Sequence, residues 1–148
     1  QLQVEITGSF SMELTTPDGR LNANGPAGGT VTRTLLIRNT GTGPLTNVTM
    51  SQTLPADWKV TYDPAGPIAQ ILPDEEITVT AVMTPANNAI AGDYVATFRA
   101  QATGSSTIDS TDIRVTIETP LNWLVVGGGL IVLVLIGLGW VFQRYGRR

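Results

Sequence analysis

Residues 72–100 read LPDEEITVTAVMTPANNAIAGDYVATFRA and contain the clearest pattern in the chain. Every second side chain is apolar from Ile77 to Met83, and again from Tyr94 to Ala100. This period of two is typical of antiparallel strands with one face buried. The intervening residues 84–93 are rich in Pro, Asn and Gly, which favour turns. The stretch therefore predicts two strands that line a core.

The same alternation recurs outward from this stretch. Further alternating segments occupy residues 2–14 (with Phe10 in the inward phase), 31–37, 48–50, 59–62 and 113–117. Turn-forming clusters separate them, and the least structured connection is expected at residues 21–30. About seven strands at this spacing predict an all-β sandwich over residues 1–119.

Trp58 has two interpretations. It follows a strand end in LPADWKV, residues 54–60, and precedes a short run that includes Tyr62. Trp58 and Tyr62 are the aromatic residues left to form a surface on which a sugar stacks. Alternatively, Trp58 folds over the open end of the sandwich and buries its ring. The flanking strands favour this plug, and we expect Trp58 to be mostly buried.

Composition excludes several chemistries. The chain has no histidine and no cysteine, so a Ser–His triad and a thiol nucleophile are both impossible. The acids at 74–76 are consecutive in a turn and are predicted to be solvated. Asp18, Asn22 and Asn24 lack the spacing of a calcium loop. We therefore predict no enzymatic activity, no catalytic residue, no metal site and no cofactor.

The charges are unevenly distributed. All twelve acids precede Pro120, together with six of the nine basic residues. An acidic body of this kind argues against nucleic-acid binding, which needs Lys and Arg to neutralise phosphates.

The C-terminal segment predicts a transmembrane α-helix over residues 120–143. Residues 123–142 carry no charge, and a helix of that length spans roughly 30 Å, the thickness of a bilayer core. A basic cytoplasmic tail follows at residues 144–148. The predicted membrane-interface anchors are Trp123, Trp140, Tyr145, Arg144, Arg147 and Arg148.

Glycines predict where this helix meets a partner. Gly128 and Gly139 are eleven residues apart, almost three turns, so they share one face. Small residues let helices pack closely in lipid. The predicted partners are the lipid bilayer and a membrane protein, which contacts the glycine-rich helix or the sandwich surface.

The motifs of the body resemble a known family. NTGTGPLTNVTM, LPADWKV, ILPDEEITVTAVMTP and AGDYVATFRAQA follow one another in the order seen in the NPCBM-associated NEW3 domain of alpha-galactosidases. The family pattern falls on Asn39 and Gly41, Pro55 and Trp58, Leu72 and Pro73, and Pro85, Gly92 and Tyr94. The resemblance implies an immunoglobulin-like sandwich with no enzymatic activity of its own.

Three positions in the resemblance carry structural expectations. Asn39 and Gly41 are expected to form a tight turn, because both residue types tolerate left-handed conformations. Asp74 stands where the family usually has glycine, so its turn must form without the easy positive φ that glycine allows. Tyr94 is expected to hydrogen-bond back to a neighbouring loop.

These observations predict a non-catalytic, single-pass, membrane-anchored interaction or structural module. Some tethered members of the family are encoded near ABC-transporter components, which implies an accessory subunit of a membrane complex or transporter. A cell-surface carbohydrate-binding module is the alternative. The expected location is a bacterial cell membrane, with the sandwich outside and the C-terminus in the cytoplasm. Gln1 fits both removal of a signal peptide and a fragment boundary.

Overall fold

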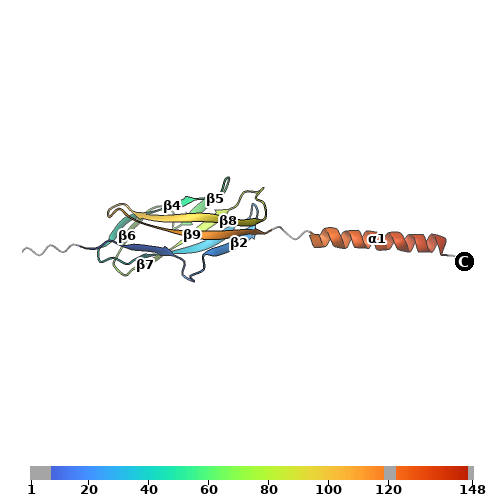
Figure 1. Cartoon of the computed structure of the whole chain (residues 1–148), viewed down its shortest axis with the longest axis horizontal. Helices are drawn as coiled ribbons and strands as arrows, with labels where there is room; N and C mark the ends of the chain where they lie inside the picture. The colour runs from blue at the N-terminus through green and yellow to red at the C-terminus, as the bar shows by residue number, and fades with distance from the viewer. Residues whose placement is uncertain (1–7, 119–122, 147–148) are drawn as a thin grey trace, which may run out of the picture.

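The computed structural model of the protein describes residues 8–118 and 123–146. Figure 1 shows a β-sandwich followed by one helix, so the predicted fold class is confirmed. The described elements are β1 (Met12–Thr15), β2 (Asn22–Pro26), β3 (Val31–Asn39), β4 (Leu45–Thr53), β5 (Lys59–Asp63), β6 (Ile68–Ile71), β7 (Glu76–Thr84), β8 (Gly92–Ala102), β9 (Thr107–Glu118) and α1 (Trp123–Tyr145).

The strands form two sheets. One has the order β1-β3-β7-β5, and the other has the order β2-β9-β8-β4-β6. Neighbouring strands are antiparallel except β2 and β9, which are parallel. The longest ladder joins β8 to β9, from Gly92 opposite Ile117 to Ala102 opposite Thr107. Strand β9 is therefore an interior strand of its sheet, flanked by β2 and β8.

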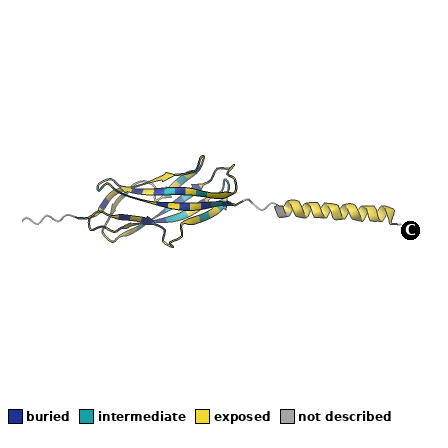
Figure 2. Cartoon of the chain, in the orientation of Figure 1, coloured by how far each residue is buried: buried dark blue, intermediate teal, exposed yellow. Residues whose placement is uncertain are grey.

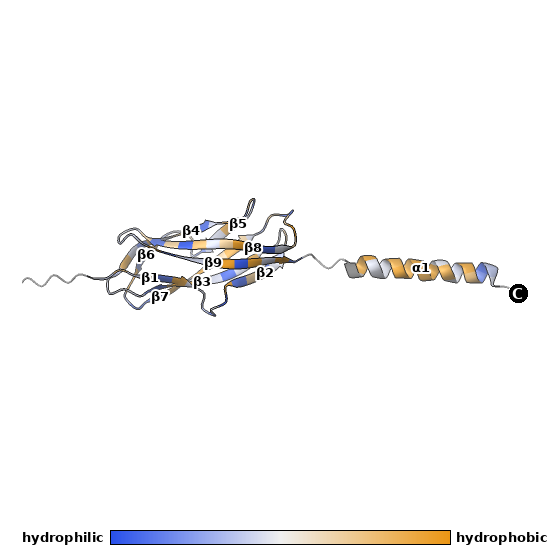
Figure 3. Cartoon of the chain, viewed as in Figure 1, coloured by the Kyte–Doolittle hydropathy of each residue, from blue (hydrophilic) through white to orange (hydrophobic). Residues whose placement is uncertain are grey.

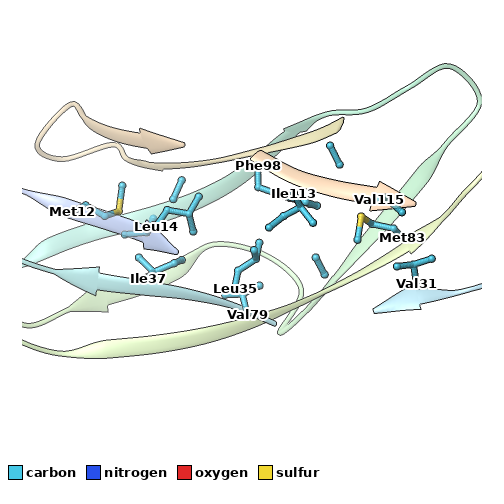
Figure 4. Close-up of a cluster of buried hydrophobic side chains, with 14 of the residues drawn as sticks. Met12, Leu14, Val31, Leu35, Ile37, Val79, Met83, Phe98, Ile113 and Val115 are labelled. Atoms are coloured by element: carbon cyan, nitrogen blue, oxygen red, sulfur yellow. The ribbon is translucent and has the colours of Figure 1, made fainter. Parts of the chain in front are cut away.

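The core lies between the two sheets. Figure 4 shows Leu35 and Val79 of one sheet facing Phe98 and Ile113 of the other, and each side chain is at most 1% exposed. Bands of buried and exposed residues alternate along the strands in Figure 2, as a pleated strand with one buried face requires. The predicted inward positions in β7 and β8 are confirmed at Val79, Ala81, Met83, Ala96, Phe98 and Ala100.

Two described strands lie outside the seven expected. Strand β2 occupies residues that were expected to be the least structured connection, and this expectation is wrong. Its residues NANGP pair with β9 from Asn22 opposite Arg114 to Pro26 opposite Glu118. An edge strand is held by backbone hydrogen bonds and needs no alternating apolar side chains, so β2 leaves no signal in the sequence. Strand β6 is short, and in it only Ile71 is fully buried.

Phe10 is a second correction. Its predicted inward phase is wrong, because 48% of the residue is exposed. The backbone just before Phe10 is hydrogen-bonded to the loop after β3, because the N–H groups of Thr42 and Gly43 donate to the Ser9 carbonyl. The Phe10 ring lies against Gly43, where an added Cβ would come within 2.6 Å of it. Within the described residues, the first buried hydrophobic side chain is Met12, two residues later, which is 7% exposed.

Helix α1 follows β9 after residues 119–122. Its described residues are exposed (Figure 2), and most of them are apolar, as the hydropathy colours of Figure 3 show. The segment Val125–Tyr145 is long enough and apolar enough to cross a membrane, and none of it is buried in the protein.

Candidate functional site

Trp58 is held at one end of the sandwich by a tight turn. The Trp58 N–H donates to the Pro55 carbonyl at 3.3 Å, and Asp57 adopts a positive φ of 63° to close the turn. The residue is 8% exposed. Its ring centroid lies 5.3 Å from that of Tyr94 at a tilt of 46°. The expected burial is confirmed, and Trp58 offers little ring surface to a sugar.

Tyr94 joins this plug to the neighbouring loop. Its hydroxyl donates to the Ile90 carbonyl at 2.8 Å, which confirms the expected hydrogen bond back to a loop. The Ile90 side chain itself is 78% exposed. The loop before β8 is therefore fixed through its backbone while its apolar side chain faces solvent.

Tyr62, the other residue of the predicted sugar platform, is half-buried on β5. Its ring meets Phe98 edge-on at 6.3 Å, and its hydroxyl is 2.8 Å from Gln52 Oε1, to which it donates. Burial raises the pKa of Tyr62 to about 12. The ring borders a hollow of about 170 Å³ lined mainly by Met50, Pro64, Pro67, Ile68 and Val79. Trp58 lies just before Lys59, the first residue of β5, and Tyr62 lies near the other end of that strand.

Asp74 and Glu75 lie in the predicted turn, and Glu76 is the first residue of β7. The Glu75 carboxylate accepts a hydrogen bond from the Leu72 N–H at 2.7 Å, and the Glu75 N–H donates to the Leu72 carbonyl at 3.1 Å. The turn does use a positive φ, because Asp74 adopts 60°. Aspartate is one of the few residue types that visit this region. Asp74 thus fills a place for which glycine is better suited.

Asn39 acts through its side chain and not through a left-handed backbone. Its amide donates to the carbonyls of Gly43 and Ile71, both at 3.0 Å, and its Oδ1 accepts from the Gly41 N–H at 2.9 Å. The chain does turn here as expected, but neither Asn39 nor Gly41 has a positive φ, so the left-handed conformation expected of them is wrong. Glycine is needed at 41 because an added Cβ would lie 2.4 Å from the Ser9 carbonyl oxygen.

The loop that contains Asp18 is closed by an ion pair with the side chain of Arg33. Arg33 donates to Asp18 Oδ1 at 2.5 Å, and the Arg20 N–H donates to the same oxygen at 3.2 Å. The Arg33 hydrogen bond is the main reason that the pKa of Asp18 is lowered. Over residues 8–118 and 123–146, no group of three His, Cys, Asp or Glu side chains is arranged to hold a metal.

The predicted helix face and anchors lie on α1. A Cβ added at Gly128 or Gly139 would meet nothing within 4 Å beyond the helix's own backbone, and the same holds for Gly127, Gly129 and Gly137, because none of the described span is buried. Near the helix end, the Arg144 guanidinium lies 5.3 Å from the Trp140 ring centroid. Trp140 is 59% exposed and Tyr145 is 78% exposed. The Trp123 side chain, Arg147 and Arg148 lie outside the described residues.

The family follows from a comparison of sequences. The family described as "NPCBM-associated, NEW3 domain of alpha-galactosidase" matches residues 26–103, more than half of the chain. The chain belongs to this family. The matched NEW3 region includes Asn39, Trp58, Asp74 and Tyr94, whose contacts are described above. No curated protein matches the chain.

Several solved structures have a fold similar to this sandwich at low sequence identity. A PapD-like domain of human CEP192 has a TM-score of 0.53 at 11% identity, covering 74% of this chain and 86% of that one. A FixG-related protein from Vibrio parahaemolyticus has a TM-score of 0.51 at 12% identity, covering 76% and 97%. A family 123 glycoside hydrolase from Clostridium perfringens has a TM-score of 0.52 at 13% identity.

The chain covers only 28% of that hydrolase, while 77% of the chain is matched. At these identities the likenesses show a common fold and nothing about activity.

Proposed function

We propose that this NEW3 protein is a non-catalytic, single-pass membrane module that serves as an accessory subunit of a membrane protein complex. The observation that carries the proposal is that a well-packed sandwich is joined to an apolar helix whose described residues are all exposed. A helix that is apolar all round needs either lipid or protein around it. The sandwich supplies neither, because none of the described span is buried against it.

The open glycine face supports a partner in the membrane. Gly128 and Gly139 leave room for another helix to approach the α1 backbone. The exposed apolar side chains on the remaining faces, such as Leu133 and Ile136, suit lipid. In this arrangement the helix both anchors the sandwich and contacts the partner.

The proposed orientation places the sandwich outside the cell and the C-terminus in the cytoplasm. Arg144, Arg147 and Arg148 follow the apolar segment, and short basic flanks favour the cytoplasmic side. The stacking of Arg144 on Trp140 suits a membrane interface, where aromatic rings and basic side chains gather.

The test is co-purification with matched variants of the helix. The full chain is extracted from its own membranes in a mild detergent, and the attached membrane proteins are identified by mass spectrometry. Gly139→Leu fills the open face and is expected to abolish the association. Gly137→Leu is the control, since two residues place it about 200° further around the helix.

The result that contradicts the proposal is a chain that leaves the membrane without detergent, or one that is always purified alone. Equal retention of a partner by Gly139→Leu and Gly137→Leu would contradict the glycine face while leaving the anchoring intact.

A further inference from the structure

The chain leaves the sandwich at an end that the strand register defines. Strand β9 ends at Glu118, which pairs with Pro26 at the end of β2, and Gly92 at the start of β8 pairs with Ile117. Lys59 at the start of β5 pairs with Thr84 at the end of β7. The connections at this end are residues 27–30, 54–58 and 85–91, and we call them the helix-proximal loops.

The helix-proximal loops are almost uncharged. Their sequences are AGGT, LPADW and PANNAIA, and Asp57 is their only charged residue. Ile90 is 78% exposed, more than any other large apolar residue described in the sandwich. The turn at the opposite end between β6 and β7 differs, because it contains the exposed acids Asp74 and Glu75.

Ile90 is presented by a fixed loop. The Ala89 N–H donates to the Ala86 carbonyl at 3.0 Å, and the Tyr94 hydroxyl donates to the Ile90 carbonyl at 2.8 Å. Tyr94 is in turn packed against the buried Trp58 ring. The exposure of Ile90 therefore results from a built loop, and a rigid apolar tip binds an interface with little loss of conformational entropy.

Chain length keeps these loops near the membrane. Residues 119–122 are all that separate β9 from α1. The distance from Glu118 to Trp123 is thus at most about 18 Å, even with the chain fully extended. If α1 spans the bilayer, its first turn lies at the interface, where the polar layer on each side is about 5–8 Å thick.

We propose that the helix-proximal loops rest on the lipid headgroup layer, with the Ile90 side chain inserted among the headgroups; this inference rests on the membrane anchoring proposed above. The expected surface is zwitterionic. Residues 1–120 carry twelve acids against six basic residues, so an anionic surface repels the sandwich. Contact at this end orients the sandwich relative to the bilayer and directs the turn that carries Asp74 away from it.

The experiment uses the full chain in phosphatidylcholine vesicles. The sequence has no cysteine, so a single one can be introduced and labelled with an environment-sensitive fluorophore. Ile90→Cys reports on the helix-proximal loops. Ile108→Cys is the matched control, because Ile108 is 52% exposed and pairs with Gln101 near the opposite end of β9. Leu133→Cys reports insertion of α1.

The expected result is a blue shift of the label at position 90 and a loss of its fluorescence when nitroxide is attached to the headgroups. The label at position 108 should show neither effect, and nitroxide on the acyl chains should quench the label at position 133. Anionic lipid in the vesicle should weaken the effect at position 90.

Two outcomes overturn the inference and are distinguishable. If position 133 is quenched while position 90 behaves like position 108, α1 is inserted but the loops do not touch lipid. If position 133 is not quenched, membrane anchoring fails and the lipid contact fails with it.

Discussion

Replacing Trp58 by alanine tests the structural role assigned to this residue. The indole ring closes one end of the sandwich, packs on Tyr94 and is 8% exposed. Alanine removes the ring and leaves a cavity that the surrounding strands fill only in part. We expect Trp58→Ala to lower the free energy of unfolding substantially. The molecules that still fold should keep their strands.

The magnitude follows from the buried surface. A buried tryptophan hides about 150–250 Å², which at about 25 cal/mol per Å² corresponds to about 4–6 kcal/mol. The retained methyl group and the partial burial in the denatured chain lower this value. Loss of the tilted contact with Tyr94 adds about 0.5–1.5 kcal/mol. The expected change in the free energy of unfolding is about 3–5 kcal/mol, the usual range for such truncations.

The assay is urea unfolding of the full chain in detergent micelles, followed by the far-ultraviolet circular dichroism of the strands. Trp58→Phe keeps an aromatic ring in the same place and should lose less stability than Trp58→Ala. Domains of this kind are commonly stable by only about 5–15 kcal/mol, so Trp58→Phe also serves if the alanine variant does not fold.

A change below about 0.5 kcal/mol for Trp58→Ala, the size of an ordinary surface effect, would refute the plug. Glycan binding that disappears in the same folded variant would restore the carbohydrate alternative. A double-mutant cycle with Tyr94→Ala should give a coupling of about 0.5–1.5 kcal/mol, and no coupling would mean that the ring contact does not matter.

Three other predictions concern single side chains. Asn39→Ala should lower the free energy of unfolding by about 2–4 kcal/mol, because it removes the donor to the buried carbonyls of Gly43 and Ile71. Asn39→Asp should be less stable than Asn39→Ala at neutral pH and should regain stability as the pH falls. An Asp variant as stable as the wild type would contradict this. Asp74→Gly should raise the thermal midpoint slightly, because φ is 60° there and glycine avoids a strain of about 1–2 kcal/mol. Part of this gain is offset by the greater chain entropy of glycine in the unfolded state. A clear fall in the midpoint would show that the Asp74 side chain has a role of its own. The pKa of Tyr62 is raised from 10.0 to about 12, so its contribution to stability is complete below pH 10.0 and is lost as the pH rises through about 12. Unfolding at alkaline pH should show this loss in the wild type and not in Tyr62→Phe.

The sequence predicted the layers of the fold because burial imposes a period on side chains. Strands β7 and β8 lie in the middle of their sheets, so their inward residues, such as Val79 and Phe98, had to be apolar. The same argument predicted the burial of Trp58. Predicted strands precede and follow it in the sequence, so its ring could be buried only by packing over the end of the sandwich. Tyr94 shares the phase of Phe98, which indicated its bond back to a loop.

The remaining features depend on contacts between distant segments, which a period does not record. Strand β2 exists because β9 offers it a partner more than ninety residues away, from Arg114 opposite Asn22 onward. Phe10 keeps the alternating phase but meets a loop and solvent. Gly41 is required by the approach of Ser9 from a different segment, not by its own φ.

The candidate site was predictable only in part for the same reason. Helix α1 and its glycines are local features and were apparent directly. The prominence of Ile90 was not, because an isoleucine among PANNAIA is an ordinary turn residue until the register places it beside the end of β9. The sequence does show an uncharged turn that contains one large apolar residue. That this turn lies at the same end of the sandwich as α1 could be known only from the strand topology.

The parallel pairing of β2 with β9 has a mechanical consequence. Any pull exerted through α1 enters the sandwich at the C-terminal end of β9 and acts along that strand. With β8 on one side and β2 on the other, β9 can slide out only if both ladders shear, and many hydrogen bonds must break together. Without β2 the tethered strand would be an edge that peels from one side. The five residues NANGP, which have no apolar pattern, thus let the sandwich resist a pull exerted through α1.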